Sequence, residues 1–349
     1  MVLRLSETWF RRPDSPTRVV FDVTRRCNLR CGMCQTWKHE GAGELSVPEI
    51  ADILRQLPRL CWLDLTGGEP FLRKDAAELL VAVAETTPQL LVLHFPTNGS
   101  FTRRTVEACT EFVARRPEVE LIVTVSIDGP PEVHDRIRGQ VGAFARAIET
   151  FAALRAMPQV SVFIGTTLTP ESEPHLDALE AELLRRFPDF EPREWHWNRL
   201  QISEHFFANG HLAEAARARR SSIDEHVRRR GLPKGFVDLM ELGFLINAEF
   251  VDRGEPSNIP CQSLRSTAFI SPEGQLYPCH VWDRPLGSLR EHSFASLWHS
   301  VEVRNARGEV ERLDCGGCFT PCEAYPALAG APLRASVETL RRGLEILRT

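Results

Sequence analysis

The stretch that decides the fold reads VVFDVTRRCNLRCGMC at residues 19–34. It opens with an apolar run typical of a buried strand, and three cysteines follow, Cys27, Cys31 and Cys34. In barrels of parallel strands, the loops at the C-terminal ends of the strands carry the chemistry. A 4Fe-4S cubane usually takes four thiolates, so a loop with three leaves one iron open to another ligand. A zinc knuckle is the alternative that three cysteines leave open.

Short apolar runs alternate with longer amphipathic runs up to about residue 202, which predicts repeated strand–helix units around a parallel sheet. The predicted strands are Val19–Thr24, Trp62–Thr66, Leu91–Pro96, Leu121–Ile127, Val160–Leu168 and Trp195–Ile202. The predicted helices are Val47–Leu57, Ala76–Glu85, Arg103–Ala114, Phe144–Ala156 and Pro174–Arg186. Because crossovers between parallel strands are right-handed, we expect an α/β fold, a partial (β/α)6 TIM-like barrel.

Glycine and polar motifs follow the next strands in turn. Gly67, Gly68 and Glu69 end the second predicted strand. The two glycines let the backbone approach a ligand closely, and Glu69 offers an acceptor for the ammonium group of a bound amino acid. Asn98 follows the third strand and Ser126 ends the fourth. We therefore expect all these groups on the same rim of the barrel as the cysteine loop.

This order of motifs resembles the radical S-adenosylmethionine superfamily. The resemblance implies that the open iron of a 4Fe-4S cluster binds S-adenosyl-L-methionine, whose reductive cleavage yields a 5′-deoxyadenosyl radical. It implies that Glu69 holds the methionine amino group, that Ser126 contacts the ribose and that Met33 packs near the adenine. Arg138 either faces the active site or pins its own loop. The implied cofactor-binding residues are Met33, Gly67, Gly68, Glu69, Asn98, Ser126 and Arg138.

A second cysteine group consists of Cys261, Cys279, Cys315, Cys318 and Cys322. Its first two members follow a C-x12-G-x4-C spacing, which resembles the SPASM auxiliary-cluster extension of many radical enzymes or its shorter relative, twitch. The full SPASM pattern has seven cysteines and two clusters, so we expect one auxiliary 4Fe-4S cluster held by four of the five. Either the first four are the ligands, or Cys322 replaces one of the preceding pair. A zinc ribbon is the alternative.

The predicted domains are an N-terminal tail at 1–18, a radical SAM partial barrel at 19–205, a helical bridge at 206–258, an auxiliary cluster domain at 259–330 and a C-terminal helix at 331–349. The bridge contains an arginine-rich stretch, with Arg217, Arg219, Arg220, Arg228, Arg229 and Arg230. This stretch predicts either a solvated helix face or a patch that meets an anionic substrate.

Composition limits the partners, the cellular location and the role of the cysteines that we expect. Lys and Arg number 42 against 47 for Asp and Glu, a net charge of -5, so we expect no nucleic-acid partner. We find no signal peptide and no run of the roughly 20 apolar residues that a membrane span needs, and we expect a cytoplasmic protein. Ten cysteines in a reducing compartment indicate metal rather than disulfides. Cys61 and Cys109 stand apart and are predicted to be small buried core residues.

The resemblance predicts an enzyme that abstracts hydrogen from a small-molecule or peptide substrate, with the auxiliary cluster assisting electron transfer. The expected electron donor is a reductase such as flavodoxin or ferredoxin. No added peptide-recognition domain is evident at either end, which favours a small molecule over the alternative of a peptide maturase. Glu204 and His205 follow the sixth strand and are either proton-transfer groups or ordinary loop residues. The rival class is a non-catalytic iron–sulfur or zinc protein, which would need no clamp such as Glu69.

Overall fold

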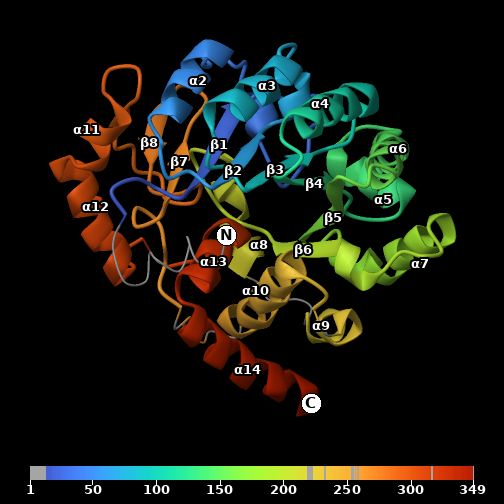
Figure 1. The fold of residues 1–349 in the computed structure, drawn as a ribbon. Helices are drawn as coiled ribbons and strands as arrows, with labels where there is room; N and C mark the ends of the chain where they lie inside the picture. The colour runs from blue at the N-terminus through green and yellow to red at the C-terminus, as the bar shows by residue number, and fades with distance from the viewer. Residues whose placement is uncertain are drawn as a thin grey trace.

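The computed structural model describes residues 13–217, 223–231, 233–252, 255, 257, 259–315 and 317–348, so Arg219 and Arg220 lie outside the described residues. One mixed sheet organises the chain (Figure 1). Its parallel part runs in chain order through β1 (Arg18–Thr24), β2 (Trp62–Gly67), β3 (Val92–Thr97), β4 (Glu120–Ser126), β5 (Val160–Leu168) and β6 (Trp195–Arg199). Each pair of neighbours is parallel, which confirms the predicted strand–helix barrel.

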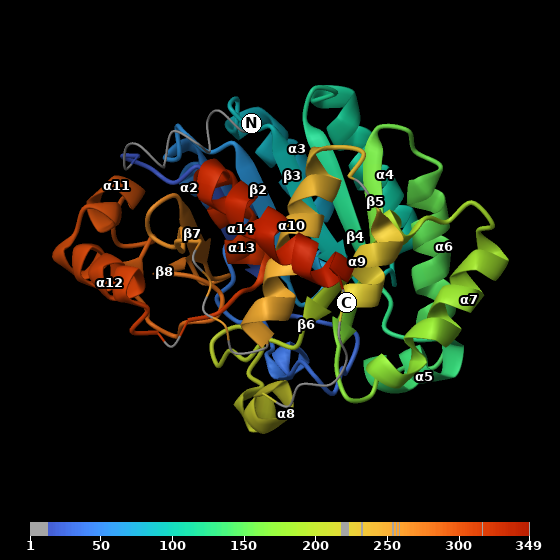
Figure 2. The ribbon, with the colours of Figure 1, turned by 90° about the horizontal axis from the view of Figure 1, so that it is seen from below.

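Helices cover the outer side of these strands in an arc (Figures 1 and 2). They are α2 (Val47–Arg55), α3 (Ala76–Thr86), α4 (Thr102–Arg115), α5 (Pro131–Arg138), α6 (Ala143–Arg155) and α7 (Leu176–Arg186). Local sequence sets where they begin. The Ser46 hydroxyl accepts the Glu49 N–H while the Glu49 carboxylate accepts the Ser46 N–H, a capping box that starts α2. Helix α5 was not among the predicted helices.

The C-terminal extension continues the same sheet. Strand β7 (Thr267–Ile270) pairs in parallel with β1, and β8 (Gln275–Tyr277) and β9 (Gly287–Ser288) follow as antiparallel neighbours. Helices α11 (Phe294–Trp298) and α12 (Val301–Arg312) come next in the chain. The auxiliary domain is thus joined to the barrel by backbone hydrogen bonds at the edge of β1, and the predicted domain limits stay a prediction.

Helices between and after these parts close the inner side of the barrel. They are α9 (Asp224–Arg230), α10 (Phe236–Asp252), α13 (Pro321–Gly330) and α14 (Pro332–Arg348), and α10 packs against both α13 and α14 (Figure 2). The short helix α8 (Ala213–Arg217) lies apart from them, at the lower margin of that view. Arg228 and Arg229 pair with Glu225, and the buried Arg230 pairs with Asp238. These contacts favour a solvated, ion-paired helix face over an anion-binding patch.

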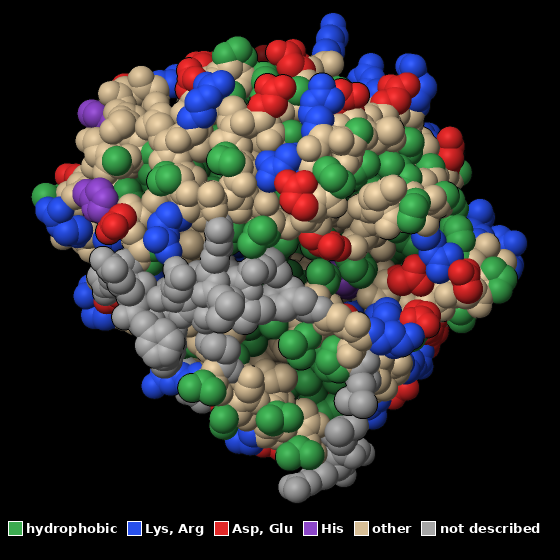
Figure 3. Space-filling view, in the orientation of Figure 1, with side chains coloured by type: hydrophobic (Ala, Val, Ile, Leu, Met, Phe, Trp, Pro, Cys, Tyr) green, Lys and Arg blue, Asp and Glu red, His purple; other side chains and the backbone are tan. Residues whose placement is uncertain are grey.

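The surface mixes both signs of charge, and hydrophobic side chains gather near the lower end of the view in Figure 3, in the region of α14. Leu333, Val337, Leu340 and Leu344 of this helix are exposed. Among the described residues, no helix combines the length and apolarity needed to cross a membrane.

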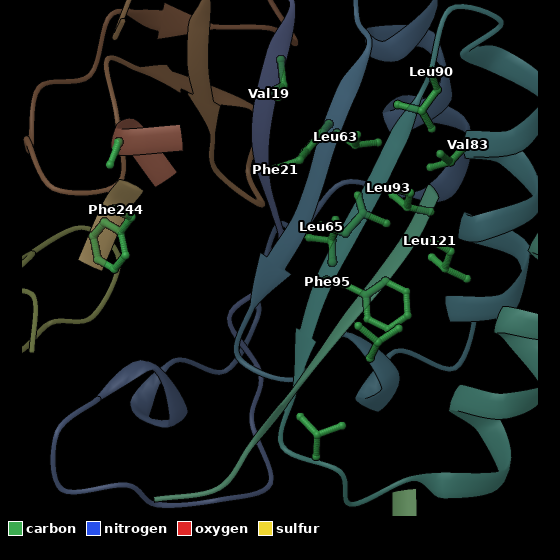
Figure 4. Packing of buried hydrophobic residues seen from close by; sticks show 14 of the residues in the cluster. Val19, Phe21, Leu63, Leu65, Val83, Leu90, Leu93, Phe95, Leu121 and Phe244 are labelled. Carbon is green, nitrogen blue, oxygen red and sulfur yellow. The ribbon is translucent and has the colours of Figure 1, made fainter. Parts of the chain in front are cut away.

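The core lies between the strands and the outer helices. Val19 and Phe21 of β1 alternate with inward-facing residues, as do Leu63 and Leu65 of β2, and Figure 4 shows these side chains packed together. Cys61 and Cys109 are fully buried in apolar surroundings, as predicted for core residues.

Ile270 tests how much the shared sheet contributes to stability. It is fully buried at the β1–β7 junction, so Ile270→Ala should lower the free energy of unfolding by about 2–5 kcal/mol through lost burial and a cavity. Urea unfolding of the iron-free protein would measure this. Val141→Ala, at a position that is 90% exposed, is the matched control and should change stability by less than about 0.5 kcal/mol.

Candidate active site

A cavity of 340 Å³ lies on the inner side of the parallel strands. Its wall includes Asp64 of β2, His94 of β3 and Thr124 of β4. Because successive side chains of a strand point to opposite faces, every second residue of these strands faces the cavity. Met240 of α10 and Tyr325 of α13 form part of the opposite wall. This volume falls within the range of pockets that enclose small molecules.

All three cysteines of the first group line this cavity. Cys31 is buried, and Cys27 and Cys34 are half-buried. Burial raises the pKa of all three thiols, that of Cys27 to about 12, and repulsion from neighbouring thiolates adds to the effect at Cys27 and Cys31. Thiolates crowded in this way form when a metal centre supplies positive charge. The donor set therefore fits a cluster at this loop.

Close backbone contacts hold the cysteine loop against the end of β2. The Gly68 N–H donates to the Thr24 carbonyl at 2.7 Å. A Cβ atom on Gly67, where φ is +134°, would lie 2.2 Å from the same carbonyl oxygen, and one on Gly68 would lie 2.3 Å from the Arg26 carbonyl oxygen. Only glycine at both positions allows the two loops to approach so closely.

The end of α5 holds the other side of the loop. The Arg138 carbonyl accepts the Arg30 N–H at 3.1 Å. The buried Arg138 guanidinium binds Asp128 at 2.6 Å, and its Nη1 atom lies 3.8 Å from the Cys31 sulfur. Because Arg138 also lines the cavity, the two predicted roles, facing the active site and pinning the loop, are compatible.

Glu69 is fully buried and is not among the residues that line the cavity. Its carboxylate accepts the Thr97 hydroxyl at 2.9 Å, the Asn98 N–H at 2.7 Å and the Phe71 N–H at 3.2 Å. Asn98 does line the cavity, and its Nδ2 atom lies 3.8 Å from the Cys27 sulfur. Glu69 thus lies beneath the wall and positions Asn98, while its contact with a ligand ammonium stays a prediction.

The other predicted cofactor-binding residues share one wall. Met33, Gly67, Gly68, Asn98, Ser126 and Arg138 line the cavity together with the three cysteines. Their individual contacts with a cofactor stay predictions.

Electrostatic interactions link the second cysteine group through Cys318. Burial is the main cause that raises the pKa of the Cys261, Cys279, Cys318 and Cys322 thiols, and repulsion between the Cys318 thiolate and those of Cys261, Cys279, Cys315 and Cys322 adds to it. Although Cys318 is exposed as a residue, burial of its thiol raises its pKa to about 12. Crowded thiols of this kind again fit a metal cluster.

Cys322 differs from the other four because it also lines the inner cavity. The first cysteine group and Cys322 of the second group therefore line the same cavity. The first group lies at the C-terminal ends of the strands, and Cys322 lies beside Arg18 at the start of β1.

Among the described residues, no three His, Cys, Asp or Glu side chains converge on a single ion.

A polar network that the sequence analysis missed crosses the floor of the cavity. Arg18 Nε donates to Asp64 Oδ2 at 2.7 Å, and His94 Nδ1 lies 2.8 Å from Asp64 Oδ1. His94 Nε2 lies 3.0 Å from the Thr124 hydroxyl. Arg18 also donates to the Cys322 carbonyl. Burial favours a raised pKa for Asp64, but Arg18 and His94 lower it to about 2.

The sequence does hold a signal for this network. Arg18, Asp64, His94 and Thr124 interrupt otherwise apolar strands, and a charged group inside a buried strand is stable only when paired.

Glu204 and His205, the predicted proton-transfer groups, do not line the cavity. Glu204 is exposed. His205 is buried, stacks on Tyr277 at 4.4 Å and lies 3.1 Å from the Cys279 carbonyl through Nε2. His205 therefore packs at the interface with the extension, and its neighbour Phe206 lines the cavity instead.

The sequence matches the profile of the radical SAM superfamily over residues 21–182 and that of an iron–sulfur cluster-binding domain, SPASM, over residues 261–319. It is 33% identical over 350 residues to the mycofactocin maturase MftC of Mycobacterium tuberculosis (strain CDC 1551 / Oshkosh), covering 95% of this chain and 84% of the relative. The chain belongs to the radical SAM superfamily. The AdoMet-dependent heme synthase of Methanosarcina barkeri is 26% identical over 361 residues, covering 93% of this chain and 94% of that enzyme.

Solved structures share the fold of this radical SAM enzyme. Streptococcus suis SuiB bound to precursor peptide SuiA has a TM-score of 0.58 at 15% identity, covering 84% of this chain and 67% of SuiB. Native anSMEcpe with bound AdoMet and Cp18Cys peptide has a TM-score of 0.54 at 14% identity, covering 93% of this chain and 99% of that one.

Membership confirms the predicted enzyme class and cofactors. The protein is a radical SAM enzyme that uses S-adenosyl-L-methionine, a catalytic 4Fe-4S cluster and an auxiliary iron–sulfur cluster in its SPASM domain. Its reaction begins with reductive cleavage of S-adenosylmethionine and hydrogen abstraction from a small-molecule or peptide substrate.

The carboxyl group of Glu69 makes stability depend on pH. Burial raises its pKa to about 7, above the ordinary value of about 4.3. A raised pKa means that the folded state holds the proton longer, so this contribution is present below about pH 4 and is lost as the pH rises to about 7. The free energy of unfolding of wild type minus that of Glu69→Gln should fall over this range by about 4 kcal/mol. Urea unfolding of the iron-free proteins at several pH values would measure it, and a constant difference would contradict the expectation.

Proposed function

We propose that Cys27, Cys31 and Cys34 hold the catalytic cluster and that substrate oxidation takes place in the 340 Å³ cavity between this loop and Cys322. The observation that carries the proposal is that all three cysteines of the first group and Cys322 of the second group line one cavity. When bound, the cluster and S-adenosylmethionine supply the 5′-deoxyadenosyl radical that removes hydrogen from the substrate.

The chain's own residues would bind and orient the cofactor and exclude water. Asn98, Ser126 and Arg138 would orient the cofactor from the rim, and Glu69 would fix Asn98 beneath it. Trp62, Val92 and other apolar side chains of the wall would exclude water from the reactive carbon.

The cavity suits a compact reacting group, either one side chain of a peptide or a small molecule. The names of two relatives, the mycofactocin maturase and the subtilosin biosynthesis protein AlbA of Bacillus subtilis, support a peptide. The heme synthase of Methanosarcina barkeri supports a small molecule. Screening deuterated candidates of both kinds for label transfer into 5′-deoxyadenosine would identify the class.

His94 is our candidate for the group that accepts a substrate proton. Asp64 binds its Nδ1 atom, so a hydrogen at Nδ1 leaves Nε2 with a lone pair beside the Thr124 hydroxyl. This is the arrangement by which a carboxylate orients a histidine base. His94 replaces Glu204 and His205 in this role.

Substitution of single cysteines should show which cysteines hold which cluster. We expect about eight irons per reconstituted chain, from two cubanes. Cys27→Ala should lose about four of these and release no 5′-deoxyadenosine. Cys279→Ala should lose a similar number and still cleave S-adenosylmethionine. Iron and zinc analysis with product chromatography checks this. Iron near zero with stoichiometric zinc in the wild type would sink the proposed function.

Substitution of His94 should affect substrate oxidation and spare cofactor cleavage. With the substrate found by the label-transfer screen, His94→Gln should form product about 10²–10⁴-fold more slowly, because a positioned base contributes that factor. Release of 5′-deoxyadenosine without substrate should match the wild type. His292→Gln, on an exposed loop, is the control. Wild-type product rates in His94→Gln would rule out the proposed base.

A further inference from the structure

The outer side of the catalytic loop carries a second hollow, separate from the cavity. Its lining residues are Cys27, Asn28, Arg30, Trp37, Lys38, His39 and Glu40. Cys27 and Trp37 line the inner cavity as well, so these two side chains form the wall between it and the outside. The short turn η1 (Thr36–Lys38), blue in Figure 2, lies at the edge of the molecule in that view. We name this surface, with Arg30, Trp37 and Lys38, the basic recess.

Unpaired positive charge sets the basic recess apart from most of the surface. Arg30 and Lys38 are exposed, and each places its cationic group 5.5 Å from the centre of the Trp37 ring. In the described part of the chain neither forms an ion pair. Elsewhere exposed arginines pair with neighbouring carboxylates, as Arg185 does with Glu182 and Arg312 with Asp314.

The other ionisable groups of the basic recess do not cancel this charge. Partial burial and Arg25 lower the pKa of His39, so it stays neutral near pH 7. Glu40 is exposed and contributes one negative charge against two positive ones. The positive charge is local, since the whole chain carries a net charge of -5.

Reductive cleavage needs one electron from outside for each S-adenosylmethionine. On their inner side, Cys27, Cys31 and Cys34 face the cavity, whereas Arg30 and Gly32 of the same loop are exposed. Electron transfer weakens steeply with distance. Because Cys27 and Trp37 line both the cavity and the outer hollow, the wall that they form is our candidate route for an electron into the proposed cluster.

We propose that the basic recess is the docking site of a small acidic protein that carries single electrons. Encounters between redox proteins bury less than about 1,200 Å² and rely on charge complementarity, so a few unpaired cations around an aromatic ring are sufficient. One electron passes from the reduced carrier to the oxidised cluster, and no proton moves. The inference rests on the proposed function, since it needs a cluster at Cys27, Cys31 and Cys34.

Rapid mixing of the reconstituted enzyme with a reduced acidic flavodoxin tests the proposal, with bleaching of the cluster absorbance as the readout. Arg30→Glu and Lys38→Glu should each lower the second-order rate constant by about tenfold or more at low salt, because charge steers association. Photoreduced deazaflavin, a small reductant, should reduce the wild type, Lys38→Glu and Arg185→Glu equally. Arg185→Glu, on α7, is the matched control with the same charge change.

Several outcomes would overturn the docking site. One is equal flavodoxin rates in Lys38→Glu, Arg30→Glu and Arg185→Glu at matched iron content. Another outcome concerns the wild type alone. Its rate constant for reduction by flavodoxin should fall at least tenfold between about 0.01 M and about 1 M salt, because salt screens the attraction that steers the two proteins together. A rate constant that does not depend on salt contradicts the proposal. Failure of the proposed function would look different, because the wild type would then show no cluster absorbance and no 5′-deoxyadenosine with deazaflavin.

Discussion

The buried ion pair between Arg18 and Asp64 is the interaction on which most of this structure depends. Arg18 begins β1, its guanidinium pairs with Asp64 of β2 at 2.7 Å, and it also holds the Cys322 carbonyl of the extension. A charge this deeply buried is costly without its partners. The barrel, the auxiliary cysteine group and the floor of the cavity are therefore fixed relative to one another by one side chain.

The sequence could predict those parts of the fold that depend on the pattern of apolar and polar residues within one strand or helix. The strand at Val160–Leu168 has the limits that were predicted, and the other five predicted strands differ by a few residues at their ends. Long apolar runs identify buried parallel strands because both faces are covered. Helix α5 was missed because it is short and starts at Pro131, directly after Pro130, where a turn is the usual expectation.

Contacts between residues far apart in the chain could not be predicted from the sequence. The pairing of β7 with β1 joins residues about 250 positions apart, and no local pattern encodes such a register. The cysteine loop was recognisable because its spacing is local. The partners in the Arg18–Asp64–His94 network are 46 and 30 positions apart, so each looked like an isolated polar residue. Glu204 and His205 were correctly placed after a strand, but packing against Tyr277 and the Cys279 carbonyl directs His205 away from the cavity.

The continuation of the sheet from β1 into β7 also bears on how such enzymes can be recombined. The extension covers the edge of the first barrel strand, and an uncovered edge of apolar, unpaired backbone invites pairing with other chains. Grafting this C-terminal part onto another barrel, or deleting it, would leave that edge open and risk self-association before any effect on chemistry appeared. Recombination during evolution should therefore keep β1 and β7 in the same exchanged segment. The exchange points should lie in loops, where a crossover leaves the β1–β7 pairing intact.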